Sequence, residues 1–147
     1  MKVALVALAF SIAGTMAQAE IVNYDCELHS MEAQGWIPPR VLLSVDADNK
    51  RARAYDGAIA SYNEYKGWSD EKPMDTKFKV NRKEQYQMQW KVTLSTSTTQ
   101  KLRVSYMARL DPKTNRFDMT ARFPMVDVVN RPSGVGRCKP VPSPNLY

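Results

Sequence analysis

The chain has 147 residues, of which 44% are hydrophobic and 24% are charged. This composition suits one domain with a packed core and is too apolar for a disordered chain. There is no internal repeat and no apolar stretch of about twenty residues, which excludes solenoid proteins and polytopic membrane proteins. One His and two Cys leave most metal-dependent and acid–base enzymes without the side chains they need.

The first nineteen residues have the three parts of a secretory signal peptide. Lys2 precedes a short apolar run, and Ala17-Gln18-Ala19 has the small residues of a cleavage site. An apolar run this short favours a signal peptide over a membrane-spanning helix, with a buried N-terminal helix as the alternative. We therefore expect removal of residues 1–19, a periplasmic or secreted location, and a single domain over residues 20–147.

Cys26 and Cys138 lie near opposite ends of the expected mature chain. Two cysteines in an oxidising compartment usually pair. A bond between them would close a loop of 113 residues, counting both cysteines. Loop-closure entropy then predicts about 4–5 kcal/mol of stabilisation. Because no Cys-x-x-Cys motif is present, we expect a structural disulfide and not a redox or metal-binding pair.

Three consecutive segments alternate apolar and polar residues with a period of two, the pattern of half-buried strands. They cover residues 86–94, 102–110 and 117–125. Residues 111–115, between the last two, begin with Asp followed by Pro, which is typical of a tight turn. Three methionines fall on the inward side, where Met usually fills the core and does not bind copper: Met88, Met119 and Met125.

The rest of the chain shows weaker alternation. Further short strands are expected at residues 22–28, 41–45, 51–55, 78–80 and 135–141. Turn residues separate them and no strong helical period occurs. Seven or eight strands predict an all-β domain, either a small antiparallel meander barrel or a β-sandwich. We favour the barrel, because its closure brings together the first and last strands, which carry the two cysteines.

The apolar positions also predict how the meander strands pair. Opposite residues in antiparallel strands point to the same side of the sheet, so apolar positions must face each other. Short turns then place Trp90 opposite Tyr106 and Leu110 opposite Phe117. Two outward rows across the three strands follow from this register: Gln87, Arg109 and Asp118 in one, and Lys91, Ser105 and Arg122 in the other. We expect an ion pair in the first row and an anion held in the second.

Charge is divided between the two halves of the chain. Residues 20–75 carry eleven acids and six bases, a net charge of −5, whereas residues 76–147 carry four acids and fourteen bases, a net charge of +10. Several of these bases lie on the outward side of the meander: Lys91, Arg103, Arg109, Arg116 and Arg122. Such a face fits an anionic or sugar-like partner, such as an envelope component or an acidic protein surface. The alternative is a solvated face that prevents strand aggregation.

Residues 57–75 interrupt the strand pattern with the aromatic residues Tyr62, Tyr65 and Trp68. Irregular connections of this length are uncommon and often functional. The segment is therefore either a binding loop or a flap that covers an open end of the barrel. A binding role requires at least two of the three rings to be exposed.

The sequence offers little catalytic chemistry. Cys26 and His29 are an odd number of residues apart, so a strand sends them to opposite faces and they cannot form a metal site or a nucleophile pair. No nucleophile elbow and no nucleic-acid-binding motif is present. We expect no catalytic residue, metal, cofactor, nucleic-acid partner or transmembrane segment. An enzyme that uses only carboxylates would need two inward acids across a cleft.

Several motifs together resemble a group of short exported proteins of alphaproteobacteria. They are Tyr24-x-Cys26, Gly35-Trp36-Ile37-Pro38, the hairpin from Val45 to Gly57, the Trp90 strand and Gly134-x-Gly136-x-Cys138. The resemblance implies export and paired cysteines but no activity. The arrangement is also loosely similar to periplasmic inhibitors of C-type lysozyme, although their Ser-Gly-x-x-Tyr segment has no counterpart here. The expected function is a non-enzymatic, envelope-associated binding protein; the alternative is an inhibitor of a secreted hydrolase such as lysozyme.

Overall fold

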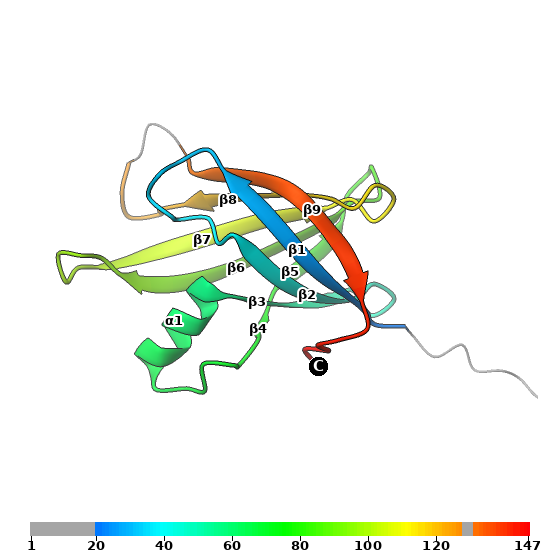
Figure 1. Cartoon of the computed structure of the whole chain (residues 1–147), viewed down its shortest axis with the longest axis horizontal. Coiled ribbons are helices and arrows are strands. Elements are labelled where there is room, and N and C mark those ends of the chain that lie inside the picture. The colour runs from blue at the N-terminus through cyan, green and yellow to red at the C-terminus, as the bar shows by residue number, and fades with distance from the viewer. Residues whose placement is uncertain (1–19, 128–130) are drawn as a thin grey trace, which may run out of the picture.

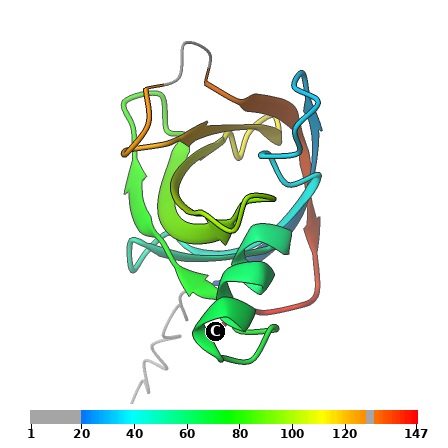
Figure 2. The same ribbon diagram turned by 90° about the vertical axis from the view of Figure 1, so that its left-hand side faces the viewer.

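The computed structural model describes residues 20–127 and 131–147, so the expected signal peptide lies outside the described residues. The described residues form nine strands and one helix (Figure 1): β1 (Val22–Ser30), β2 (Arg40–Asp46), β3 (Arg51–Asp56), α1 (Gly57–Lys66), β4 (Met74–Asp75), β5 (Lys77–Val80), β6 (Tyr86–Ser95), β7 (Lys101–Leu110), β8 (Arg116–Arg122) and β9 (Ser133–Val141). The strands make one antiparallel sheet that curls into a nearly closed barrel (Figure 2). The predicted all-β barrel is confirmed, with β4 as the strand that the sequence did not indicate.

The sheet closes because its two edge strands follow each other in the chain. The strand order is β4-β3-β2-β1-β9-β8-β7-β6-β5, and only Thr76 separates β4 from β5. The backbone N–H and the hydroxyl of Thr76 both donate to the carbonyl oxygen of Ala52, at 3.0 and 2.9 Å. The chain itself therefore holds the two edges beside each other.

The first and last long strands meet at the predicted disulfide. Cys26 lies opposite Cys138 in the β1–β9 ladder and the two are bonded. The backbones approach so closely that a Cβ atom on Gly136 would lie 1.7 Å from the carbonyl oxygen of Glu27. Glycine is therefore required at position 136, where any side chain would push β9 away from β1.

The meander has the predicted register. Trp90 lies opposite Tyr106, and Leu110 lies opposite Phe117. Arg109 and Asp118 face each other across β7 and β8 and form an ion pair, with Nη2 and Oδ2 3.0 Å apart. The alternation of apolar residues therefore determines which side of the sheet each charge occupies.

Side chains fill the interior of the barrel. The largest of those that are fully buried include Tyr106, Phe117, Leu43, Met88 and Met119. The prediction that Met125 also points inward is wrong, because its side chain is 71% exposed. β8 ends at Arg122, two residues before Pro124, whose missing N–H prevents continuation of the ladder.

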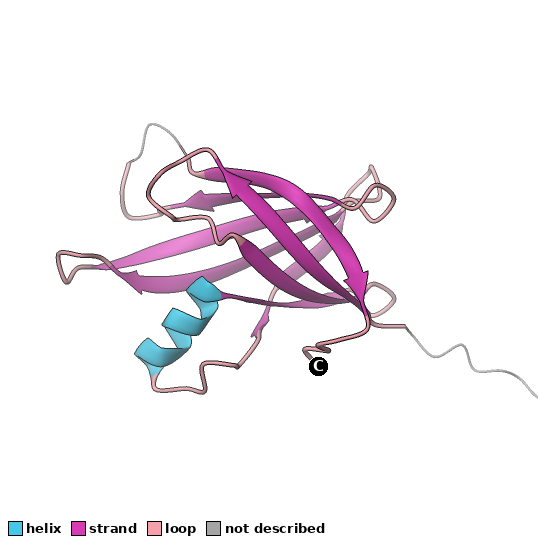
Figure 3. Ribbon diagram, in the orientation of Figure 1, coloured by secondary structure: helices cyan, strands magenta, loops and turns pink. Residues whose placement is uncertain are grey.

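The segment 57–75 is not the irregular loop that the sequence predicted, because it begins with helix α1 (Figure 3). Asp56 caps the helix by accepting a hydrogen bond from the N–H of Ile59, at 2.8 Å. Gly67 ends it in the left-handed conformation, with φ of 69°. Only Ile59 and Asn63 of the helix are buried, which explains why no apolar period marks it. Among the described residues, no helix has the length and apolar character to cross a membrane.

Candidate anion-binding site

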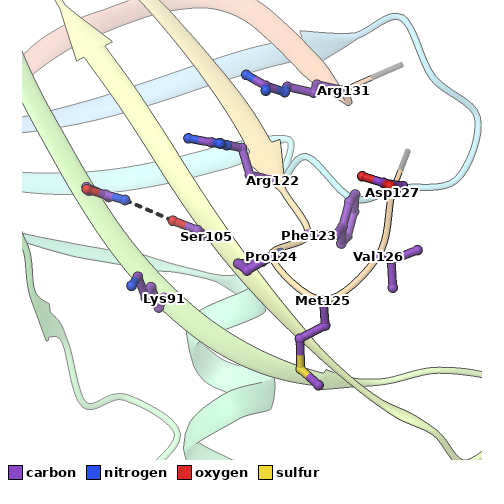
Figure 4. A pocket seen from close by; sticks show the side chains of 10 residues that line it. Lys91, Ser105, Arg122, Phe123, Pro124, Met125, Val126, Asp127 and Arg131 are labelled. Atoms are coloured by element: carbon purple, nitrogen blue, oxygen red, sulfur yellow. Dashed lines mark hydrogen bonds between the residues drawn. The ribbon is translucent and has the colours of Figure 1, made fainter. Parts of the chain in front are cut away.

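A hollow on the outer face of the meander brings together three cationic side chains (Figure 4). It has a volume of about 590 Å³. We call it the basic hollow: its cations are Lys91, Arg122 and Arg131, its floor includes Ser105, and residues 123–127 form its rim. Lys91, Ser105 and Arg122 are the second outward row predicted from the register, so the proposed anion position coincides with a concave surface.

The hollow forms because a small residue lies between two long ones. Ser105 pairs with Lys91 on one side and with Arg122 on the other. Two strand spacings separate the outer strands, so the Cα atoms of Lys91 and Arg122 are about 10 Å apart. Ser105 is short and buried between them, and its hydroxyl accepts a hydrogen bond from Nε2 of Gln89 at 3.0 Å.

The rim is positioned by an aromatic contact. Phe123, the first residue after β8, is buried, and its ring packs edge-to-face with Trp36, with the ring centroids 5.0 Å apart. The N–H of Ala121 then donates to the carbonyl oxygen of Pro132 at 2.9 Å, which brings the chain back to the sheet. Arg131 therefore lies beside the meander face. Its contribution was not predicted, because it belongs to a loop without alternation.

The cations of the hollow are not neutralised by neighbouring acids. Among the described residues, no carboxylate lies within ion-pair distance of Lys91, Arg122 or Arg131. Asp127 on the rim is the one acid among the described lining residues, and it forms no ion pair with these cations. Three cations and one carboxylate therefore line one concave surface together with a hydroxyl and an amide, which leaves the hollow with a net positive charge. Arg can bind a phosphate or carboxylate through two parallel hydrogen bonds.

The rest of the predicted basic face lies outside the hollow. Arg109 is paired with Asp118, and both line a separate depression together with Arg116. Arg103 is exposed but does not line the basic hollow. The predicted basic face therefore has three parts in the structure. Lys91 and Arg122 line the basic hollow, and Arg109 is paired with Asp118. Arg103 and Arg116 lie outside the hollow and have no ion pair among the described residues.

The three aromatic residues cluster near the end of α1. The side chain of Tyr65 is 46% exposed and that of Trp68 is 44% exposed, whereas Tyr62 is half-buried between them. The exposure required of a binding platform is therefore present. However, Nζ of Lys101 lies 4.2 Å from the centre of the Tyr65 ring, and Nζ of Lys72 lies 3.9 Å from that of Trp68.

These lysines change what the aromatic cluster can bind. Each ammonium occupies a ring face on which a sugar would stack. Lys101 also donates a hydrogen bond to the Tyr65 hydroxyl at 2.9 Å, which lowers the pKa of that phenol. The cluster is therefore a set of cation–aromatic contacts on the surface, and we do not place a sugar site there.

A larger groove lies at the mouth of the barrel, between α1, the segment before β2 and the β6–β7 hairpin. Its volume is about 840 Å³. Aromatic residues line it together with hydroxyl side chains of the hairpin, and no Lys or Arg is among its described lining residues. The hydroxyl of Tyr106 already donates to the carbonyl oxygen of Trp36 at 2.7 Å, and burial raises the pKa of Tyr106. The groove therefore offers no attraction for an anion.

One carboxylate among the described residues is buried without a cation. Burial raises the pKa of Asp56 to about 6. Its Oδ1 accepts the helix-capping hydrogen bond, whereas its Oδ2 has no hydrogen-bond partner among the described residues. Asp56 therefore belongs to the helix cap in the barrel interior and not to the basic hollow.

No family model, curated protein or solved structure matches the chain. The resemblance to short exported alphaproteobacterial proteins therefore stays a prediction.

Proposed function

We propose that the protein is a non-enzymatic binding protein of the cell envelope that holds an anionic group in the basic hollow. The observation that carries the proposal is the convergence of Lys91, Arg122 and Arg131 on one concave surface with no described carboxylate paired to any of them. Cations left unpaired around a hollow attract an anion more strongly than cations spread over a flat surface. The signal-like segment at residues 1–19 supports a periplasmic or secreted location.

The side chains suit a phosphate or carboxylate group. Arg122 and Arg131 present planar guanidinium groups that can donate paired hydrogen bonds, and Lys91 supplies a compact charge on the opposite side of Ser105. Because these groups are exposed to solvent, binding should weaken as salt is added.

Nuclear magnetic resonance can test the proposal with inorganic phosphate as the probe. At low salt, phosphate should shift the backbone amide signals of residues 105, 122 and 131 most strongly. The double variant Arg122→Gln/Arg131→Gln should lose these shifts, whereas the matched variant Arg103→Gln/Arg116→Gln, which removes the same charge outside the hollow, should retain them. Equal loss in both variants would show that net charge and not the hollow attracts phosphate.

A protein inhibitor of a hydrolase would need a protruding rigid loop in place of a pocket. The described surface carries a basic hollow and a groove without Lys or Arg, so we do not advance an inhibitor as the second function.

A further inference from the structure

The rim of the basic hollow carries an exposed apolar tip made of Pro124, Met125 and Val126. Met125 is 71% exposed and Val126 is 49% exposed. In Figure 4 both side chains point away from Arg122 and Arg131. Water contacts these apolar side chains directly, and consecutive exposed apolar residues beside a binding site often mark an interaction surface.

A second exposed methionine lies at the same end of the barrel. Met31 is 94% exposed and belongs to the segment between β1 and β2. Figure 1 shows this segment and the segment after β8 projecting at one end of the barrel. The contact between Trp36 and Phe123 joins the two segments. Apolar side chains and unpaired cations are therefore combined at one end of the molecule.

This combination is typical of proteins that lie on an anionic membrane surface. Apolar side chains enter the boundary between headgroups and acyl chains, and Lys and Arg beside them contact lipid phosphates. Each cation close to an anionic bilayer strengthens binding by about fivefold. Phosphate groups of a bilayer would meet the basic hollow, while the apolar tip would leave water.

The barrel interior excludes a different arrangement, in which a single lipid is enclosed. Tyr106, Phe117 and Met119 are fully buried and belong to the packed core that fills the space inside the sheet. An acyl chain therefore has to remain outside the barrel. A bilayer satisfies this condition, because the chain stays among other lipids while its headgroup is bound.

We propose that this end of the barrel docks on a bilayer of anionic phospholipid, with a lipid phosphate in the basic hollow and Met125 and Val126 in the interfacial layer. The proposal rests on the anion-binding function proposed above and names its partner. It assigns separate roles to two neighbouring groups: the cations select the charge of the surface, and the apolar tip makes the association with the surface stable.

Co-sedimentation with lipid vesicles tests the docking proposal, using the protein purified with its disulfide intact. Vesicles of phosphatidylglycerol and phosphatidylcholine in equal parts should bind the protein, and vesicles of phosphatidylcholine alone should not. Met125→Ser/Val126→Ser should weaken vesicle binding by about tenfold or more, because two apolar side chains no longer leave water. The same variant should keep the amide shifts caused by inorganic phosphate.

Two controls separate the possible failures. Met107→Ser/Val135→Ser removes exposed apolar side chains from strands away from the tip and should leave vesicle binding unchanged. Arg122→Gln/Arg131→Gln should abolish both vesicle binding and the phosphate shifts. Phosphate binding without vesicle binding would overturn the docking proposal and leave the anion site intact. Vesicle binding that the apolar-tip variant does not weaken would also overturn it.

Discussion

Two rows of side chains cross the same three strands of the meander and differ in whether their cations have an acid beside them. In the row of Gln87, Arg109 and Asp118, the arginine has a carboxylate directly opposite it on the next strand. In the row of Lys91, Ser105 and Arg122, the strand between the two cations carries only a serine. The first row satisfies its charges internally, whereas the second leaves them for a partner. The presence or absence of a carboxylate opposite the arginine therefore separates a structural surface from a candidate site.

The largest expected effect comes from the disulfide, because both rows depend on a sheet that stays closed. Cys26→Ala/Cys138→Ala should lower the free energy of unfolding by about 4–5 kcal/mol, since the unfolded chain regains the freedom of a very long loop. Urea unfolding followed by tryptophan fluorescence measures the change. Reduction of the wild-type disulfide should give a similar loss. A variant as stable as the oxidised protein would show that the hydrogen bonds of the sheet close the barrel without help.

The next effect extends the comparison to Asp56, a carboxylate with no cation beside it. Its pKa of about 6 in the folded protein exceeds the ordinary value of 3.8, so the folded state binds more protons than the unfolded state between these values. Its contribution to stability is therefore full below about pH 4 and lost as the pH rises through about 6. The contribution of Asp56 to the free energy of unfolding should therefore differ by roughly 3 kcal/mol between these two pH ranges.

Asp56→Asn is the variant that isolates this effect, because Asn also caps helices well and carries no charge. The stability of the wild type relative to the variant should fall as the pH rises from 4 to 7. Urea unfolding at several pH values measures this difference, in which the contributions of other acids cancel. A constant difference would contradict the raised pKa.

The smallest expected effect comes from a variant that adds a carboxylate to the row of Lys91, Ser105 and Arg122. Ser105→Asp places a carboxylate between Lys91 and Arg122, as Asp118 lies opposite Arg109. Phosphate binding should weaken by about tenfold or more, because the cations gain an internal partner. The opposite change, Asp118→Ser, frees Arg109 and should leave phosphate binding in the hollow unchanged. Equal weakening by both variants would contradict the difference between the rows.

The pairing of the meander could be predicted because a strand has a period of two. Shifting one strand by a single residue would bury Arg103 and Arg109 and expose Tyr106, so the apolar pattern excludes such a shift, and the short turns select one of the remaining registers. The ion pair of Arg109 and the approach of Lys91 to Arg122 followed from this register. The disulfide could be predicted because the chain has two cysteines and an expected oxidising compartment.

Other features depended on contacts that no local pattern records. Helix α1 has two buried residues, so it lacked a periodic signal, although Asp56 and Gly67 are residues that commonly begin and end a helix. Met125 continues the alternation of apolar and polar residues seen in β8, but the strand ends at Arg122 and the Met125 side chain is exposed. Arg131 reaches the hollow only because the chain returns to the sheet at Pro132.

The class of fold, the register of the meander and the side of the sheet on which each charge lies could be inferred from the amino-acid sequence, because burial acts on every second residue of a strand. Which charges are neutralised and which surround a hollow depended on tertiary contacts. That outcome depends on how β4 and β5 bring the edges of the sheet together and on how Trp36 holds Phe123 at the rim of the basic hollow. Such contacts join residues far apart in the chain, and their formation depends on the path of the whole barrel.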